Sequence, residues 1–164
     1  MTTVHERLEF DMPAPCVVVF DAFHFHCWRA KWDSLVSDTE VVGGEPCPYV
    51  GAITVNTGRG VLRPLRMTTQ FVSFERPRVA AAKMIGASFP FQRWAAGMQH
   101  KPIGADNSLL IYTYSYEIGD SHFRRLLTPL VKWVFARQTR IRFARLREFL
   151  VLHTNDVQRW QQAN

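Results

Sequence analysis

Residues 108–118, SLLIYTYSYEI, decide the fold class of this chain. Side chains of a β-strand point to opposite faces in turn, so an extended chain here separates two kinds of residue. One face carries Leu110, Tyr112, Tyr114 and Tyr116. The other face carries Thr113, Ser115 and Glu117, which suit solvent. The stretch therefore predicts a strand with one inward, aromatic face, whose hydroxyls either meet a ligand or find backbone and water partners within a filled core.

Shorter apolar runs separated by turn residues precede this strand. They are 50–57, 65–74, 79–85 and 89–99. Strands joined by such short links are typical of an antiparallel meander. In the run 89–99, strict alternation places Phe91 on one face and Trp94 on the other, and it leaves open which face points inward.

The two ends of the chain complete the pattern. Residues 4–11 alternate as a first strand, and two short helices are expected over 16–25 and around Trp28 and Trp32. At the other end, Thr128 and Pro129 suit the start of a helix that runs to about residue 153. A helix of roughly 25 residues is about 37 Å long, so it must lie across the sheet to bury its apolar side.

The arginines of this last helix carry the sharpest question. We place Ile141 at the centre of the apolar stripe. Leu130, Val134 and Leu152 then fall within about 20° of it, and Gln138 lies to one side. Arg142 then lies at the margin, whereas Arg145 falls inside the stripe. A guanidinium there needs an internal partner such as Glu148, a path to solvent, or a cavity that holds water or an anion.

The net charge and the cysteines limit the possible partners and the cellular location of the protein. The net charge is +6, and residues 121–164 alone hold nine basic and two acidic residues. This excess suits a solvated helix face, or a surface that meets anionic lipid or nucleic acid. Three cysteines and no apolar leader at the N-terminus favour a reducing, cytoplasmic location. No metal-ligand cluster or phosphate loop stands out, and we expect neither a metal nor another cofactor.

Several short motifs occur in an order known from one superfamily. They include Ala14-Pro15-x-x-x-Val19-Phe20, Glu40-Val41-Val42-Gly43-Gly44, Phe74-Glu75-Arg76-Pro77-Arg78 and the strand 108–114. The chain resembles the START-like or SRPBCC superfamily, nearest its polyketide cyclase/dehydrase and lipid transport branch. In its "F-x-P-P-R" link, Arg76 replaces the usual first proline.

The resemblance implies an α+β helix-grip fold, in which a curved antiparallel sheet of about seven strands wraps around a long C-terminal helix. We expect one ligand-binding domain over residues 1–155 and a polar tail over 156–164. The resemblance also implies an apolar cavity between sheet and helix. The residues that we expect to line it are Tyr112, Tyr114, Tyr116, Phe91, Trp94, Val134, Gln138, Ile141 and Arg145.

Three functions follow, in this order. The first is binding of a hydrophobic or aromatic small molecule, such as a lipid or a polyketide-like compound. The second is an aromatase/cyclase-like enzyme acting in the same cavity, for which no catalytic residue can be named. The third is docking of the arginine-rich helix on anionic lipid or nucleic acid, of which nucleic acid is the partner that we expect least. The protein is expected to be a monomer or a homodimer.

Overall fold

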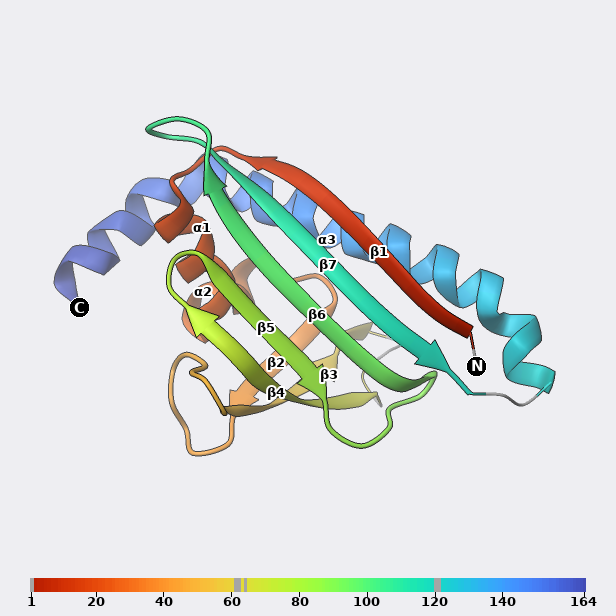
Figure 1. Ribbon diagram of the computed structural model, residues 1–164. Helices are drawn as coiled ribbons and strands as arrows, with labels where there is room; N and C mark the ends of the chain where they lie inside the picture. Colours follow the sequence, from red (N-terminus) through yellow and green to blue (C-terminus); the bar gives the residue numbers. More distant parts are fainter. Residues whose placement is uncertain (1, 61–62, 64, 120–121) are drawn as a thin grey trace.

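The computed structural model of the chain describes residues 2–60, 63, 65–119 and 122–164 (Figure 1). Its elements are β1 (Thr2–Met12), α1 (Cys16–His24), α2 (His26–Trp32), β2 (Val36–Val41), β3 (Ile53–Gly58), β4 (Arg66–Glu75), β5 (Val79–Met84), β6 (Phe91–Pro102), β7 (Ser108–Ile118) and α3 (His122–Ala163). This order confirms the predicted succession of strand, two short helices, meander and long helix.

The strands of the described residues form one antiparallel sheet in the order β1-β7-β6-β5-β4-β3-β2. Figure 1 shows the sheet curving, with α3 along one side and α1 and α2 at one end. The chain therefore has the helix-grip α+β fold that the sequence predicts. The core lies between the concave face of the sheet and the helices.

The inward face of β7 is as predicted. Leu110, Tyr112, Tyr114 and Tyr116 are all at most 5% exposed. The tyrosine rings contact aromatic side chains of α3. Between ring centroids, Tyr112 lies 4.9 Å from Phe143 and Tyr114 lies 4.8 Å from Phe135. Aromatic contacts of this geometry add to the stability gained by burial.

A β-bulge in β6 answers the question of which face points inward. Phe91 pairs with Ile118, whereas Arg93 pairs with the adjacent Glu117, so one residue of β6 is extra. The bulge shifts the alternation by one position. Phe91 and Trp94 therefore both face the interior, where Phe91 is buried and Trp94 is half-buried, while Arg93 is exposed.

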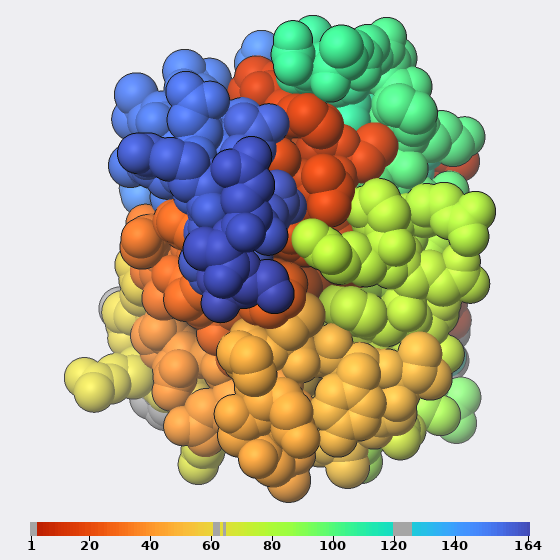
Figure 2. Space-filling model, turned by 90° about the vertical axis from the view of Figure 1, so that its left-hand side faces the viewer, coloured from red at the N-terminus to blue at the C-terminus, as the bar shows by residue number. Residues whose placement is uncertain are grey.

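Helix α3 is longer than predicted at both ends. Its 42 residues correspond to about 63 Å, with Pro129 inside the helix rather than at its start. The residues expected to form a polar tail continue the helix, and Val157 is fully buried. Trp160 packs edge-on against Phe25 and Trp28. Figure 2 shows this C-terminal end, in dark blue, lying against the α1–α2 region.

The sequence predicts that the apolar stripe of α3 faces the core, and this prediction is wrong. Leu130, Val134 and Leu152, which define that stripe with Ile141, are 55%, 40% and 76% exposed. The buried residues of the helix lie on the nearly opposite side: Thr139, Arg142, Phe143, Leu146, Phe149, Leu150 and Val157. The helix is apolar on two faces, and only one of them meets the sheet.

None of the helices in the described part of the chain combines the length and the apolar character needed to cross a bilayer.

Candidate functional site

A cavity lies between the concave side of β3–β7 and the helices. The centres of water molecules can occupy about 70 Å³ of this cavity. One water needs roughly 10–15 Å³ by this measure, so the space corresponds to about five waters. A cavity of this size can hold one aromatic ring with a substituent.

Small side chains of two neighbouring strands create this space. Ala80 and Ala82 of β5 and Ala96 of β6 line it, and Ala82 pairs directly with Ala96 across the strands. Inward side chains on these strands meet the cavity, so a methyl group leaves room that a larger residue would fill. The aromatic rings of Trp94 and Phe71 also line this apolar part.

The opposite part of the lining is polar and is built on one buried carboxylate. Asp33, at the end of α2, is 1% exposed. Its Oδ2 accepts hydrogen bonds from Nε of Arg29 at 2.9 Å and from Nη2 of Arg142 at 2.6 Å. Its Oδ1 accepts the backbone N–H of Leu35 at 3.0 Å. These contacts tie α2 to α3 and to the chain that leads into β2.

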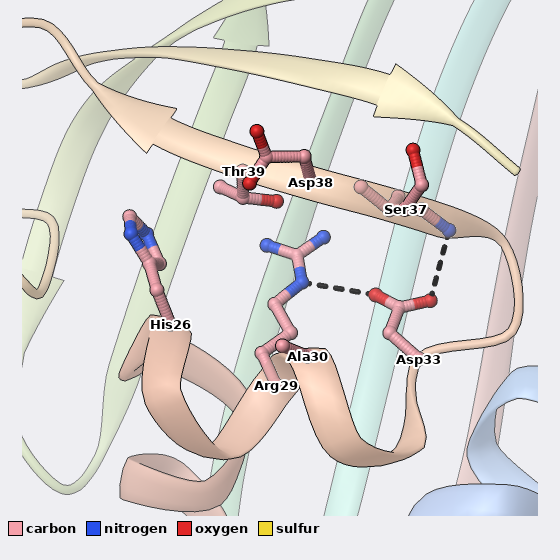
Figure 3. A pocket seen from close by; sticks show the side chains of 8 residues that line it. His26, Arg29, Ala30, Asp33, Ser37, Asp38 and Thr39 are labelled. Carbon is pink, nitrogen blue, oxygen red and sulfur yellow. Dashed lines mark hydrogen bonds and ion pairs between the residues drawn. The ribbon is translucent and has the colours of Figure 1, made fainter. Parts of the chain in front are cut away.

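Arg29 separates the cavity from a smaller pocket between α2 and β2, because it lines both. The smaller pocket has about 30 Å³ open to the centre of a water molecule, and Asp38 and Thr39 lie on its β2 side. Figure 3 shows Nε of Arg29 turned to Asp33 and its two terminal nitrogens pointing toward β2. The terminal nitrogens are thus turned away from Asp33.

The ring of Phe23 holds both guanidinium groups in place. The Cζ atom of Arg29 lies 5.1 Å from the ring centroid, and that of Arg142 lies 5.0 Å from it. A guanidinium over an aromatic ring is attracted by the negative face of the ring. Phe23 also lines the cavity, so it connects the charged part of the lining to the apolar part.

The cluster keeps its charges despite burial. Burial alone would raise the pKa of Asp33, but the guanidinium groups of Arg142 and Arg29 hold that pKa below its ordinary value. Burial and the neighbouring Arg142 lower the pKa of Arg29, and Asp33 opposes that shift. Since an arginine begins from a pKa of 12.5, it stays protonated at neutral pH.

The other two titratable groups of the lining are neutral. Burial lowers the pKa of His24 to about 3, and nearby Arg29 and Arg142 act in the same direction. Its Nδ1 donates a hydrogen bond to the carbonyl oxygen of Phe20 at 2.9 Å. Burial raises the pKa of the Tyr112 hydroxyl, so this residue is an uncharged phenol.

The structure brings only some of the predicted site residues to the cavity. Tyr112 and Trp94 line the cavity. Tyr114, Tyr116 and Phe91 belong to an aromatic cluster around Phe135 that fills the neighbouring interior. The hydroxyl of Tyr116 is buried and has no hydrogen-bond partner among the described residues.

The residues predicted on α3 do not line the cavity. Gln138 and Ile141 are half-buried, and Val134 and Arg145 are exposed. Arg145, expected within the apolar stripe, reaches solvent because that stripe is exposed, whereas Arg142, expected at its margin, is buried. Arg142 is 7% exposed and is the arginine of α3 that reaches the cavity.

Sequence reasoning missed Arg29, Asp33 and His24 as well. Arg29 and Asp33 are four residues apart on and just after α2, a spacing that favours an ion pair. That spacing alone does not show that the pair is buried. Asp33 is covered by Arg142, which lies 109 residues further along the chain. No local pattern signals such a long-range contact.

Comparison with known proteins supports the fold and not a closer relationship. The chain matches no protein-family model and no curated protein sequence. Solved structures match over nearly the whole chain. A protein from Thermus thermophilus is 17% identical with a TM-score of 0.74, over 90% of this chain and 97% of that one.

Two enzymes share the same architecture. The Zhui aromatase/cyclase from Streptomyces sp. R1128 is 13% identical with a TM-score of 0.71, over 92% of this chain and 96% of its own. Norcoclaurine synthase from Thalictrum flavum, solved with dopamine and hydroxybenzaldehyde, is 14% identical with a TM-score of 0.65, over 93% and 88%. At these identities the likeness establishes the helix-grip fold, as the sequence resemblance implied.

Proposed function

We propose that this protein binds a ring-sized aromatic or apolar molecule in the cavity between its sheet and its helices. The observation that carries the proposal is the hollow left by Ala80, Ala82 and Ala96 inside an otherwise aromatic interior. Apolar walls with a few convergent polar groups are typical of small-molecule sites. A solved relative in fold holds dopamine and hydroxybenzaldehyde, which are compounds with one ring.

The size of the cavity narrows the ligand class. Sites for drug-sized ligands have volumes of about 300–1,000 Å³. The cavity here is much smaller, at about 70 Å³ open to the centre of a water molecule. A one-ring compound therefore suits it better than a long lipid chain or a multi-ring polyketide.

The titratable groups favour binding over catalysis. A general base works best when its pKa lies near the operating pH. Of the titratable residues that line the cavity, His24 has a pKa of about 3, and Arg29 and Tyr112 keep their protons at neutral pH. Such a set can orient a ligand through hydrogen bonds, but it offers little basicity for proton abstraction.

Filling the hollow tests the proposal. Ala96→Leu places a larger side chain into the cavity, so we expect binding of the one-ring probe benzamide to weaken about tenfold, or about 1.4 kcal/mol. Ligand-observed NMR titration measures this loss. The matched control is Ala95→Leu on the same strand, because Ala95 lies on the outer face of the sheet. Equal affinities of the two variants, or no binding of benzamide to the unaltered protein, would contradict the proposal.

A second candidate function rests on the outward stripe of α3, which we define as Leu126, Leu130, Trp133, Val134, Arg137, Arg145 and Leu152. All of these side chains are exposed. A helix that lies on an anionic membrane buries exposed apolar side chains at the lipid surface and attracts the headgroups with its arginines. Nucleic acid would attract the arginines but would gain nothing from the leucines, so an anionic lipid surface is the better partner.

A further inference from the structure

The polar part of the cavity lining has an excess of positive charge. Two guanidinium groups, those of Arg29 and Arg142, meet the single carboxylate of Asp33. All ion pairs that these two arginines make with described residues end on Asp33. One positive charge is therefore left over beside the cavity.

The neighbouring groups do not cancel this charge. His24 and Tyr112 are neutral at pH 7. Asp38 is exposed at the edge of the smaller pocket and forms no ion pair with Arg29 within 4.0 Å. A buried cluster with a net charge is costly, so a site that keeps one is suited to a ligand that supplies the opposite charge.

We infer that Arg29 and Arg142 form the anion subsite of the cavity, and that the ligand is a one-ring aromatic acid whose carboxylate binds there. This inference rests on the proposed function and adds the substrate class to it. A single negative charge matches the single excess charge, whereas a doubly charged phosphate would exceed it. The planar fork of a guanidinium also matches the geometry of a carboxylate.

The arrangement of the lining fits both ends of such a molecule. Phe23 contacts both guanidinium groups and lines the cavity, so the charged part of the lining continues directly into the apolar part. There the alanines of β5 and β6 and the ring of Trp94 leave space for an aromatic ring. A ligand with its carboxylate on Arg29 and Arg142 would thus place its ring against the alanine wall.

The experiment compares benzoate with benzamide, which has nearly the same shape and no charge. Ligand-observed NMR titration gives both affinities for the unaltered protein and for Arg29→Met. We expect the unaltered protein to prefer benzoate by about tenfold or more, as a charge-assisted hydrogen bond implies. Arg29→Met should lose this preference and still bind benzamide, since it leaves Asp33 and Arg142 paired one to one.

The control variant is Arg145→Met, which removes an exposed arginine of α3 and should keep the preference. If benzamide binds in the cavity but the unaltered protein does not prefer benzoate, the anion subsite is refuted and the proposed function stands. A preference that persists in folded Arg29→Met has the same meaning. If neither probe binds the unaltered protein, both proposals fail. If Arg29→Met does not fold, the absence of a benzoate preference in the unaltered protein still refutes the anion subsite.

Discussion

At the scale of single residues, Arg76 shows how a departure from a motif acquires a structural role. It stands where the corresponding link of the superfamily that the sequence resembles usually has its first proline. Its Nε and Nη2 donate hydrogen bonds to the two carboxylate oxygens of Asp21 at 2.7 and 2.6 Å. Asp21 is fully buried in α1 and also accepts a hydrogen bond from Gln161 of α3. The arginine therefore joins the β4–β5 turn to both helices.

We expect Arg76→Met to lower the free energy of unfolding by about 2 kcal/mol, because it leaves a buried carboxylate without its charged partner. Urea denaturation followed by tryptophan fluorescence measures the loss. Arg78→Met is the matched control, since Arg78 and its partner Glu75 are exposed and such pairs contribute less than about 1 kcal/mol. Similar losses in the two variants would show that the Arg76–Asp21 pair has no special role.

At the scale of elements, α3 marks the limit of pattern-based prediction. A hydrophobic pattern identifies a face that avoids water, but it does not say which of two such faces meets the sheet. The buried face contains Arg142 and Thr139, which lower its apparent apolar character, whereas the outward stripe contains Leu130 and Val134. On the buried face, Arg142 pairs with Asp33 from a distant part of the chain, a contact that no local pattern signals.

The outward stripe should bind anionic vesicles. A second copy of the chain is a poorer partner, because two facing stripes would bring Arg137 and Arg145 of both copies together. We expect binding to phosphatidylcholine vesicles that contain phosphatidylserine, weakening as salt screens the arginines. The double variant Leu130→Ser/Val134→Ser should weaken it about tenfold, or about 1.4 kcal/mol.

Val72→Ser is the control for the stripe, because Val72 is an exposed valine on β4, away from α3. Co-sedimentation with the vesicles measures binding of the full chain. Equal binding by the two variants, or binding that does not need phosphatidylserine, would contradict a role of the stripe. Self-association of the unaltered protein in solution, lost in the double variant, would assign the stripe to a dimer instead.

At the scale of the whole molecule, the order of elements was predictable and the site was not. Period-two alternation in β7 and turn residues between the strands act locally, so the sequence shows them directly. Tyr112 could be placed at the cavity for the same reason, since it lies on the inward face of a regular strand. Trp94 required a bulge, and Arg29, Asp33 and Arg142 required a contact between residues 109 positions apart. Such features follow from packing, to which local patterns give no access.

Stability of the whole molecule should fall in acid because of two buried histidines. Burial lowers the pKa of His24 to about 3 and that of His100 to about 4, from an ordinary value of 6.5. Below pH 6.5 the unfolded chain takes up protons at these positions and the folded chain does not. The contribution of the two histidines to the free energy of unfolding is therefore fully present above pH 6.5. It decreases toward pH 4, by at most about 1.4 kcal/mol per pH unit for each histidine.

The variant His100→Met separates this contribution from that of other groups. Both ring nitrogens of His100 are buried and have no hydrogen-bond partner among the described residues, so methionine removes polar atoms that gain nothing from the fold. We expect the variant to be at least as stable at pH 7. Between pH 6.5 and 4 its free energy of unfolding should fall less steeply, by up to about 1.4 kcal/mol per pH unit, because the unfolded variant takes up one proton fewer. Urea midpoints measured across this range decide the matter. An unchanged slope would mean that His100 titrates in the folded protein as it does in the unfolded chain, and that its burial does not oppose protonation.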